Sequence, residues 1–275
     1  MSKRSASHEI ETSKYKLCSM FIHVAGAGPD LVLLHGLPQP PEDFASFVRV
    51  LAASHRVLVV HLPGYGRSAP RCGEYVLSEV GAELASTLRT HHVQRPLLVG
   101  CSGGGYRALQ LALDHPKLAA RGVVQLGPIA GFEDADRARF AATADAVEAG
   151  VDLEDALLAS MFSRAFVELE PTLTRRVVRD MLHAAPRSVI AAELRAFSVA
   201  PDLRPRLSEL AAPMLLRVGS EDVATPLEHA RDVASRCGAK LDVVQGAGHL
   251  LHHEDFHGTV DAVRRFDADD RELSS

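Results

Sequence analysis

The chain has 275 residues, of which 47% are hydrophobic and 24% are charged, a composition typical of a globular protein with a sizeable core. Its formal net charge of −5 excludes the strongly basic surface that nucleic-acid binding requires. No apolar stretch approaches the roughly 18 residues of a membrane-spanning helix. We therefore expect neither nucleic acid nor a membrane among the partners.

The ends of the chain and the cysteines bear on location. Residues 1–13 are polar and lack the apolar segment of a secretory signal, so we expect a flexible leader there. Residues 267–275 are acidic and polar, and we expect them to be flexible as well. The cysteines are widely spaced with no CxxC pair, which predicts reduced thiols in a cytoplasmic protein; they are Cys18, Cys72, Cys101 and Cys237.

Short apolar or β-branched runs recur along the chain between helical patterns. In chain order, strands are predicted at 16–24, 31–35, 56–61, 97–101, 122–126, 214–218 and 241–244. Helices are predicted between and after them at 41–53, 78–91, 104–115, 226–236 and 254–265. Continuous apolar strands that alternate with helices indicate an α/β protein with a mostly parallel, doubly wound sheet covered on both faces.

The strand pattern is interrupted between residues 129 and 210, where helical periodicity predominates. Helices are predicted here at 135–149, 153–166, 171–183 and 188–197. The segment is too long for a loop within a compact domain, and its apolar faces need a surface to cover. We therefore expect residues 14–128 and 211–266 to form the core domain, with 129–210 as a helical cap over the carboxyl edge of the sheet.

The most informative motif is a serine between glycines where a predicted strand meets a predicted helix. Gly100-Cys101-Ser102-Gly103-Gly104 has the G-x-S-x-G form, in which glycines allow close backbone approach at a tight turn. The turn exposes the Ser102 hydroxyl as a candidate nucleophile at the N-terminal N–H groups of the helix. Since neighbouring strand residues point to opposite faces, we expect Cys101 to face the core.

A serine nucleophile needs an adjacent base, and a catalytic histidine needs a carboxylate on its second ring nitrogen. His249 lies in a Gly-Ala-Gly-His loop just after one predicted strand, and Asp222 lies in a loop after another. We predict Ser102, Asp222 and His249 as a catalytic triad. The oxyanion needs two donors, for which we predict the backbone N–H groups of Gly103 and of Leu37, in the loop after the strand at 31–35.

Other histidines follow His249 closely. His252, His253 and His257 fall at or near the next helix start, where we expect a solvated helix face. His249 and His253 are four residues apart, which is a spacing found in metal sites. No matching carboxylate or cysteine cluster accompanies them in the sequence, so we expect no metal.

These features resemble the α/β-hydrolase superfamily over nearly the whole chain. The matching segments are His35-Gly36, the loop 63–68, the Ser102 turn and the loops 219–226 and 246–249, with serine, aspartate and histidine in that fold's order. The helical insertion is similar to the cap of the branch that contains 3-oxoadipate enol-lactonase and related esterases. The resemblance implies an α/β-hydrolase fold with the cap inserted after the sixth strand.

Two positions depart from the superfamily pattern. His61 stands where aspartate is usual before the loop 63–68, and we expect it either to hold that loop or to alter the pocket edge. Gly103 stands where many relatives carry a large side chain, and we expect the glycine to widen the acyl side of the pocket.

The triad and the resemblance together predict a serine hydrolase that cleaves a carboxylic ester or lactone through an acyl-enzyme intermediate, with no cofactor. We expect a small-molecule substrate, and the oligomeric state stays open. The residues expected to line the pocket are His35, Gly36, His61, Phe132, Met161, Phe162 and Leu250. Arg139, Arg164 and Arg195 in the cap are candidates to bind a substrate carboxylate, with solvated helix faces as the alternative.

Two further functions fit the same sequence. The fold also supports a carbon–carbon bond hydrolase, a thioesterase, or a biosynthetic enzyme of acyl transfer or cyclisation. A ligand-binding receptor with little turnover would retain the pocket, and some receptors of this fold keep their triad.

Overall fold

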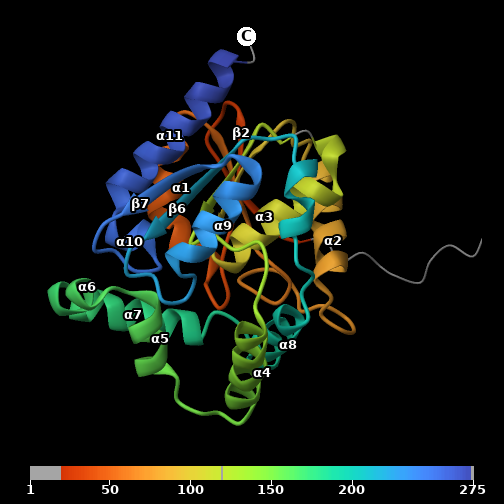
Figure 1. Cartoon of the computed structure of the whole chain (residues 1–275). Coiled ribbons are helices and arrows are strands. Elements are labelled where there is room, and N and C mark those ends of the chain that lie inside the picture. Colours follow the sequence, from red (N-terminus) through yellow and green to blue (C-terminus); the bar gives the residue numbers. More distant parts are fainter. Residues whose placement is uncertain (1–19, 119, 274–275) are drawn as a thin grey trace, which may run out of the picture.

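The computed structural model describes residues 20–118 and 120–273, and its centre is a seven-stranded sheet within those residues (Figure 1). The strand order is β1-β3-β2-β4-β5-β6-β7. The strands are β1 (Ile22–Ala25), β2 (Asp30–Leu34), β3 (Arg56–Val60), β4 (Leu97–Cys101), β5 (Gly122–Leu126), β6 (Met214–Gly219) and β7 (Lys240–Val244). β1 pairs antiparallel with β3, and every other neighbouring pair is parallel. The predicted strand at 16–24 begins outside the described residues and is observed from Ile22.

Burial on both faces explains the continuous apolar strands of the sequence. Every residue of β2, β4, β5 and β6 is buried. The side chains of β2 alternate between two cores: Leu31 and Leu33 pack on one face, Val32 and Leu34 on the other. This is the mostly parallel, doubly covered sheet that the sequence predicts.

Helices cover the two faces. The helices α1 (Ala45–Leu51) and α11 (Phe256–Leu273) pack on one face, and α2 (Leu77–Thr90), α3 (Gly103–Asp114) and α9 (Leu227–Cys237) pack on the other (Figure 1). Short helical turns join them: η1 (Pro41–Phe44), η2 (Pro116–Leu118), η3 (Arg204–Glu209) and α10 (Leu251–Glu254). Among the described residues, none of the helices is both long and apolar enough to cross a membrane.

The last helix is longer than the sequence pattern indicated. A flexible end was expected from residue 267, but α11 continues to Leu273. Asp267 is buried and accepts a hydrogen bond from Arg121 Nε at 2.6 Å. This buried contact holds an acidic segment in the helix that its composition alone would leave free.

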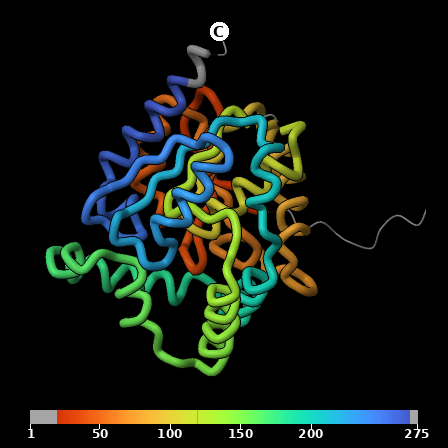
Figure 2. The backbone as a smooth tube through the Cα atoms, viewed as in Figure 1, coloured from red at the N-terminus to blue at the C-terminus, as the bar shows by residue number. Residues whose placement is uncertain are grey.

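Five helices between β5 and β6 lie beyond one end of the sheet, and they form the green and teal segment of Figure 2. They are α4 (Asp134–Glu148), α5 (Glu154–Met161), α6 (Arg164–Leu169), α7 (Pro171–Leu182) and α8 (Arg187–Ser198). α4 packs on α8, while α5 and α6 pack on α7. The helix expected at 153–166 is divided in two, because Ser163 caps α6 by accepting a hydrogen bond from the Phe166 N–H.

The insertion point differs from the one expected. The cap follows β5, the fifth strand of the described sheet, rather than a sixth strand. The cap still lies between the strands expected at 122–126 and 214–218. A single described strand, β1, precedes β2, so the count of strands before the cap is one lower than the resemblance implied.

A buried ion pair joins the cap to the core. Arg107 on α3 donates to Glu193 on α8, and both side chains are almost completely buried. Tyr65 also donates its hydroxyl hydrogen to Glu193, and Arg107 donates to the Tyr75 hydroxyl at 3.3 Å. The helix that follows Ser102 is therefore joined to the cap through an ion pair that is buried away from solvent.

Glu193→Leu leaves the Arg107 guanidinium buried without its counter-charge. We expect the free energy of unfolding, measured by urea denaturation, to fall by about 3 to 5 kcal/mol. Arg195→Leu, an exposed change on the same helix, is the matched control and should leave the urea midpoint nearly unchanged. The double variant Arg107→Met/Glu193→Leu should recover most of the loss; a double variant as unstable as Glu193→Leu would contradict this account.

Candidate functional site

The turn at Ser102 places its side chain at the start of α3. Ser102 has a φ of +51°, a strained value for a residue with a side chain. A Cβ at Gly100 would lie 2.3 Å from the Gly104 carbonyl, and a Cβ at Gly104 would lie 2.1 Å from Leu34 O. The glycines are therefore needed because the strand, the turn and the helix touch through their backbones. The Ser102 N–H donates to Leu126 O at 2.7 Å, which anchors the turn on β5.

Cys101, next to the serine, faces away from the site. It is buried in the core, where its sulfur lies 4.0 Å from His252 Nδ1. Burial raises the pKa of its thiol, which keeps it protonated and unreactive. The expectation that Cys101 points into the core is confirmed. Cys72 and Cys237 are free thiols too, and Cys18 lies outside the described residues.

The structure brings Asp222 and His249 into contact. The His249 Nδ1–H donates to Asp222 Oδ2 at 2.8 Å, and both side chains are buried. Asp222 is held in place by Thr225, whose N–H and hydroxyl donate to its two oxygens, each at 2.8 Å. With its proton on Nδ1, as a donor to Asp222 requires, a neutral His249 has its lone pair on Nε2, and this buried atom has no hydrogen-bond partner among the described residues. This is the arrangement that the predicted general base requires.

The imidazole of His249 lies beside the Ser102 turn. Gly127 follows Leu126, which accepts the Ser102 N–H, and a Cβ at Gly127 would lie 2.5 Å from His249 Cε1. No hydrogen bond joins Ser102 to His249, since Nε2 is unpartnered. In unliganded sites such bonds are often long and shorten when substrate binds.

The loop that carries Leu37 lies against Ser102. A Cβ at Gly36 would be 3.2 Å from Ser102 Cβ. The Gly36 N–H donates to Gln39 Oε1 at 2.7 Å, and the Gly36 carbonyl accepts from His35 Nδ1 at 3.0 Å. Among the described residues, no hydrogen bond occupies the Leu37 N–H. Gln39, which the sequence analysis missed, thus supports the predicted oxyanion loop. A glutamine three residues past the His35-Gly36 motif carries no sequence signal for this role.

The second predicted donor, the Gly103 N–H, lies at the first position of α3 and has no intrahelical acceptor. The space beside Gly103 is filled by the cap. A Cβ there would lie 3.0 Å from Phe197 Cζ, and Arg107 Nη1 donates to the Gly103 carbonyl at 3.3 Å. The expectation that Gly103 widens the pocket is therefore wrong, because the ring of Phe197 from α8 occupies the space a larger side chain would take.

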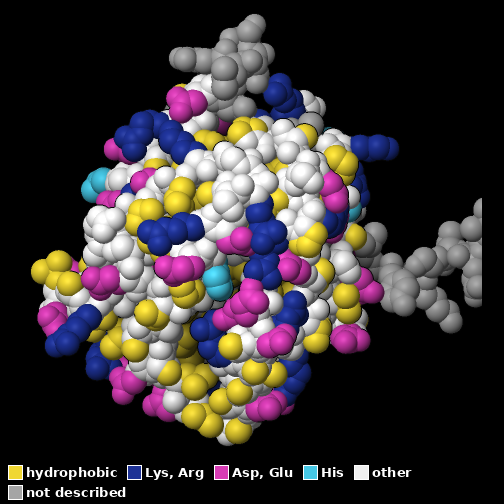
Figure 3. All heavy atoms as spheres, in the orientation of Figure 1, with side chains coloured by type: hydrophobic (Ala, Val, Ile, Leu, Met, Phe, Trp, Pro, Cys, Tyr) yellow, Lys and Arg dark blue, Asp and Glu magenta, His cyan; other side chains and the backbone are white. Residues whose placement is uncertain are grey.

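A large cavity of about 780 Å³ lies between the two groups of cap helices. It reaches the predicted oxyanion loop at Leu37 and the Asp222 loop at Ala224. Its apolar lining includes Phe140, Val147, Leu153, Leu157, Met161, Ile190 and Leu194. Hydrophobic side chains also gather on the surface at this cap end of the molecule, with charged groups around them (Figure 3).

Met161 is one residue of the predicted pocket that lines this cavity; the other six do not. His35 is buried and accepts a hydrogen bond from the Leu62 N–H, and Gly36 is buried beside it. Phe132 packs in an aromatic cluster with Tyr106, Phe140 and Phe197. Phe162 stacks on Phe166, and Leu250 is in the core. These residues were expected to line the pocket, but they lie in packing interfaces instead.

His61 holds the loop 63–68, which was one of its two expected roles. Its Nδ1 accepts from the Arg67 N–H at 3.1 Å, and its carbonyl accepts from Ser68 Oγ at 2.6 Å. Its ring lines a separate cavity of about 310 Å³ with Phe21, on the other side of this loop from the large cavity. His61 therefore holds the loop 63–68 in place of the usual aspartate.

The loop of His249 is fastened to the cap. The His249 and Leu250 N–H groups donate to Met161 O at 3.2 and 3.0 Å. The carboxylate of Glu254 accepts from Ser163 Oγ at 2.6 Å and from the Gly248 N–H at 3.1 Å. The sequence did not indicate this role of Glu254, because Ser163, its partner in the cap, lies 91 residues away in the chain.

The cap arginines and the neighbouring histidines have distinct environments. Arg139 lines the large cavity and is paired with Asp136, and Arg164 and Arg195 are exposed and paired with Glu168 and Glu148. His252 is buried rather than on a solvated face, and its neighbour His253 turns to Asp43 instead of His249; His257 is exposed as expected.

Comparisons with known proteins agree with the fold described above. A family model described as "Alpha/beta hydrolase family" matches residues 31–262. A pimeloyl-[acyl-carrier protein] methyl ester esterase of Edwardsiella ictaluri is 32% identical over 263 residues, which cover 87% of this chain and 95% of that protein.

Solved structures match over most of the chain as well. A hydrolase from Pseudomonas aeruginosa superposes with a TM-score of 0.80 at 26% identity, covering 89% of this chain and 92% of that one. The enol-lactonase from Burkholderia xenovorans has a TM-score of 0.79 at 23% identity, covering 90% and 96%. These matches confirm the predicted fold class.

Burial lowers the pKa of His35 from 6.5 to about 3, so the folded protein keeps this imidazole neutral while the unfolded chain protonates it below about pH 6.5. The unfolded state then binds more protons, and stability falls as the pH falls through that window. We expect His35 to contribute a loss of about 2 kcal/mol between pH 7 and pH 5. His35→Gln should flatten the pH dependence of the unfolding free energy by that amount, and exposed His257→Gln should not.

Proposed function

Because the chain belongs to the alpha/beta hydrolase family and is a hydrolase, we propose that it cleaves carboxylic esters or lactones with Ser102, His249 and Asp222. The contact between Asp222 and His249 is the main observation in support. A proton on Nδ1 leaves the lone pair on Nε2, and the imidazole lies against Gly127, next to the residue that anchors the Ser102 turn.

In this mechanism His249 Nε2 removes the proton of the Ser102 hydroxyl while Oγ attacks the substrate carbonyl carbon. Asp222 stabilises the imidazolium that forms. The imidazolium then gives its proton to the leaving alkoxide, and an acyl-enzyme remains. Water, deprotonated by His249, releases the acid and restores Ser102.

The oxyanion of each tetrahedral intermediate is bound by the N–H groups of Leu37 and Gly103. Each donor is worth roughly 3 kcal/mol in transition-state stabilisation. Gln39 and the Arg107–Glu193 pair support the two segments that carry these donors, so no rearrangement of the backbone is needed.

The substrate we propose is a small ester with an apolar chain. The cavity of about 780 Å³ has a volume usual for small-molecule sites, and apolar side chains form most of its lining. A relative acting on a pimeloyl methyl ester is consistent with this class. The free thiols favour the reducing cytoplasm as its compartment.

A fluorophosphonate probe tests the nucleophile. We expect rapid labelling of the parent protein, none in Ser102→Ala, and full labelling in Cys101→Ala. Asp222→Asn should lower kcat on an active ester by about 10⁴-fold, because the variant no longer holds the His249 imidazole in the tautomer with its proton on Nδ1. Absence of labelling in the folded parent protein would favour a ligand-binding receptor. Turnover of a thioester or a β-diketone, with no ester or lactone cleaved, would favour the other acyl or carbon–carbon chemistries.

A chain-length series tests the cavity. From acetyl to octanoyl esters, kcat/KM should rise by up to about fourfold per buried methylene. Leu157→Trp fills part of the cavity, and we expect it to lower the octanoyl value at least about tenfold while sparing the acetyl ester. Leu169→Trp, at an exposed position of α6, is the matched control. Equal loss on both esters would place the acyl chain elsewhere.

A further inference from the structure

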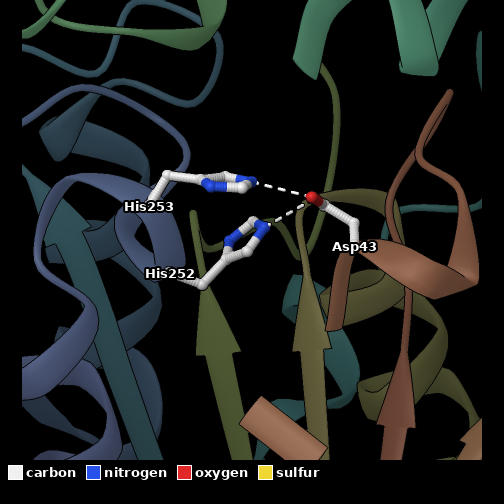
Figure 4. Close-up of side chains that lie close together, drawn as sticks. All are labelled: Asp43, His252 and His253. Carbon is white, nitrogen blue, oxygen red and sulfur yellow. Dashed lines mark hydrogen bonds and ion pairs between the residues drawn. The ribbon is translucent and has the colours of Figure 1, made fainter. Parts of the chain in front are cut away.

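Three side chains that the proposed mechanism does not use converge at one point. Asp43 lies in η1, and His252 and His253 lie in α10; Figure 4 shows both imidazoles aimed at the carboxylate. His252 Nε2 lies 2.8 Å from Asp43 Oδ2, and His253 Nε2 lies 2.8 Å from Asp43 Oδ1. Two adjacent residues of a helix normally diverge, so their convergence on one carboxylate is a specific arrangement.

A glutamine side chain completes this group. The Gln39 amide is oriented by the Gly36 N–H, which donates to Oε1, so the Gln39 NH₂ faces the cluster. That nitrogen lies 2.6 Å from Asp43 Oδ2 and 2.9 Å from His252 Nε2. With protons on both Nε2 atoms, the two imidazoles and the Gln39 NH₂ all donate to the Asp43 carboxylate. Two imidazole nitrogens and one carboxylate therefore converge at a single point.

We propose that Asp43, His252 and His253 form a binding site for a divalent transition-metal ion, with Zn²⁺ as the best match. Two imidazole nitrogens and one carboxylate oxygen are ligands that zinc prefers. The ligand atoms all lie within 4.8 Å of one another. A cation between them takes the place of the two Nε2 protons that the carboxylate otherwise accepts.

The spacing of the ligands fits a tetrahedral ion. Ligands about 2.1 Å from zinc are separated from one another by roughly 3.4 Å. The nitrogen–oxygen separations of 2.8 Å therefore need to open by only about half an ångström, within the freedom of these side chains. Asp43 and His253 also line a cavity of about 520 Å³, together with His183, which gives a fourth ligand or water access to the ion.

The ion would join segments that are 209 residues apart in sequence. One segment is η1, directly after the loop of Leu37 and Gln39, and the other is α10, directly after His249. The ion's role is therefore a structural link rather than a step in ester hydrolysis. This site does not depend on the proposed function, so either proposal can fail without the other.

Zinc binding to chelator-treated, tag-free protein tests the site by isothermal titration calorimetry. We expect one Zn²⁺ per chain, a micromolar or tighter Kd, and a rise of several degrees in Tm on addition of Zn²⁺. His253→Gln changes a partly exposed side chain and should weaken binding at least tenfold, as should Asp43→Asn. His257→Gln, an exposed histidine of α11, should bind like the parent protein.

Two outcomes would overturn the proposal. One is the absence of saturable zinc binding by the folded parent protein. The other is binding that persists in His253→Gln and Asp43→Asn but is lost in His249→Gln, which would place the ion at the proposed triad. Co²⁺ gives a readout on the unmodified chain: absorption bands of tetrahedral nitrogen and oxygen ligation are expected, and an octahedral, aqueous-type spectrum would contradict the site.

Discussion

The backbone contact at the Ser102 turn is the constraint on which the site depends. β4 and α3 approach so closely at this turn that Gly100 has no room for a Cβ, and Gly104 has none because it lies against the end of β2. The contact directs the start of α3, with its free N–H groups, toward the carboxyl edge of the sheet. Since β2 and β5 are parallel neighbours of β4, the loops after them meet at the same place, and these loops carry Leu37 and Gly127.

The cap is attached to the core at two points, the start of α3 and the loop of His249. On one side, the Arg107–Glu193 pair and the Phe197 ring fasten α8 to the first turns of α3. On the other side, Glu254 and the Met161 carbonyl join the cap to the loop of His249. The walls of the large cavity and the proposed catalytic groups therefore share their supports, and a displacement of the cap would disturb the N–H donors and the base together.

Much of the fold could be predicted because periodicity is a local property. Continuous apolar runs marked the buried parallel strands, and helical spacing marked the inserted cap. The loops of Asp222 and His249 could be located because each follows a strand of a parallel sheet, where such loops converge. The orientation of side chains was harder to predict: Phe132 and Phe162 were expected to line the pocket, but their rings pack against other aromatic rings. The space expected beside Gly103 is likewise filled by the ring of Phe197, a residue of a distant helix.

The sequence by itself determined the doubly wound sheet, the helical insertion and the order of serine, aspartate and histidine, since these follow from residue types and their spacing. Only the tertiary structure decided which side chains meet. It joined Asp43 to His252 and His253 and left His257 in solvent, although the three histidines share one short segment. The physical reason is that the burial and hydrogen bonding of a polar side chain depend on partners that folding brings together. The local sequence does not indicate which partners these are.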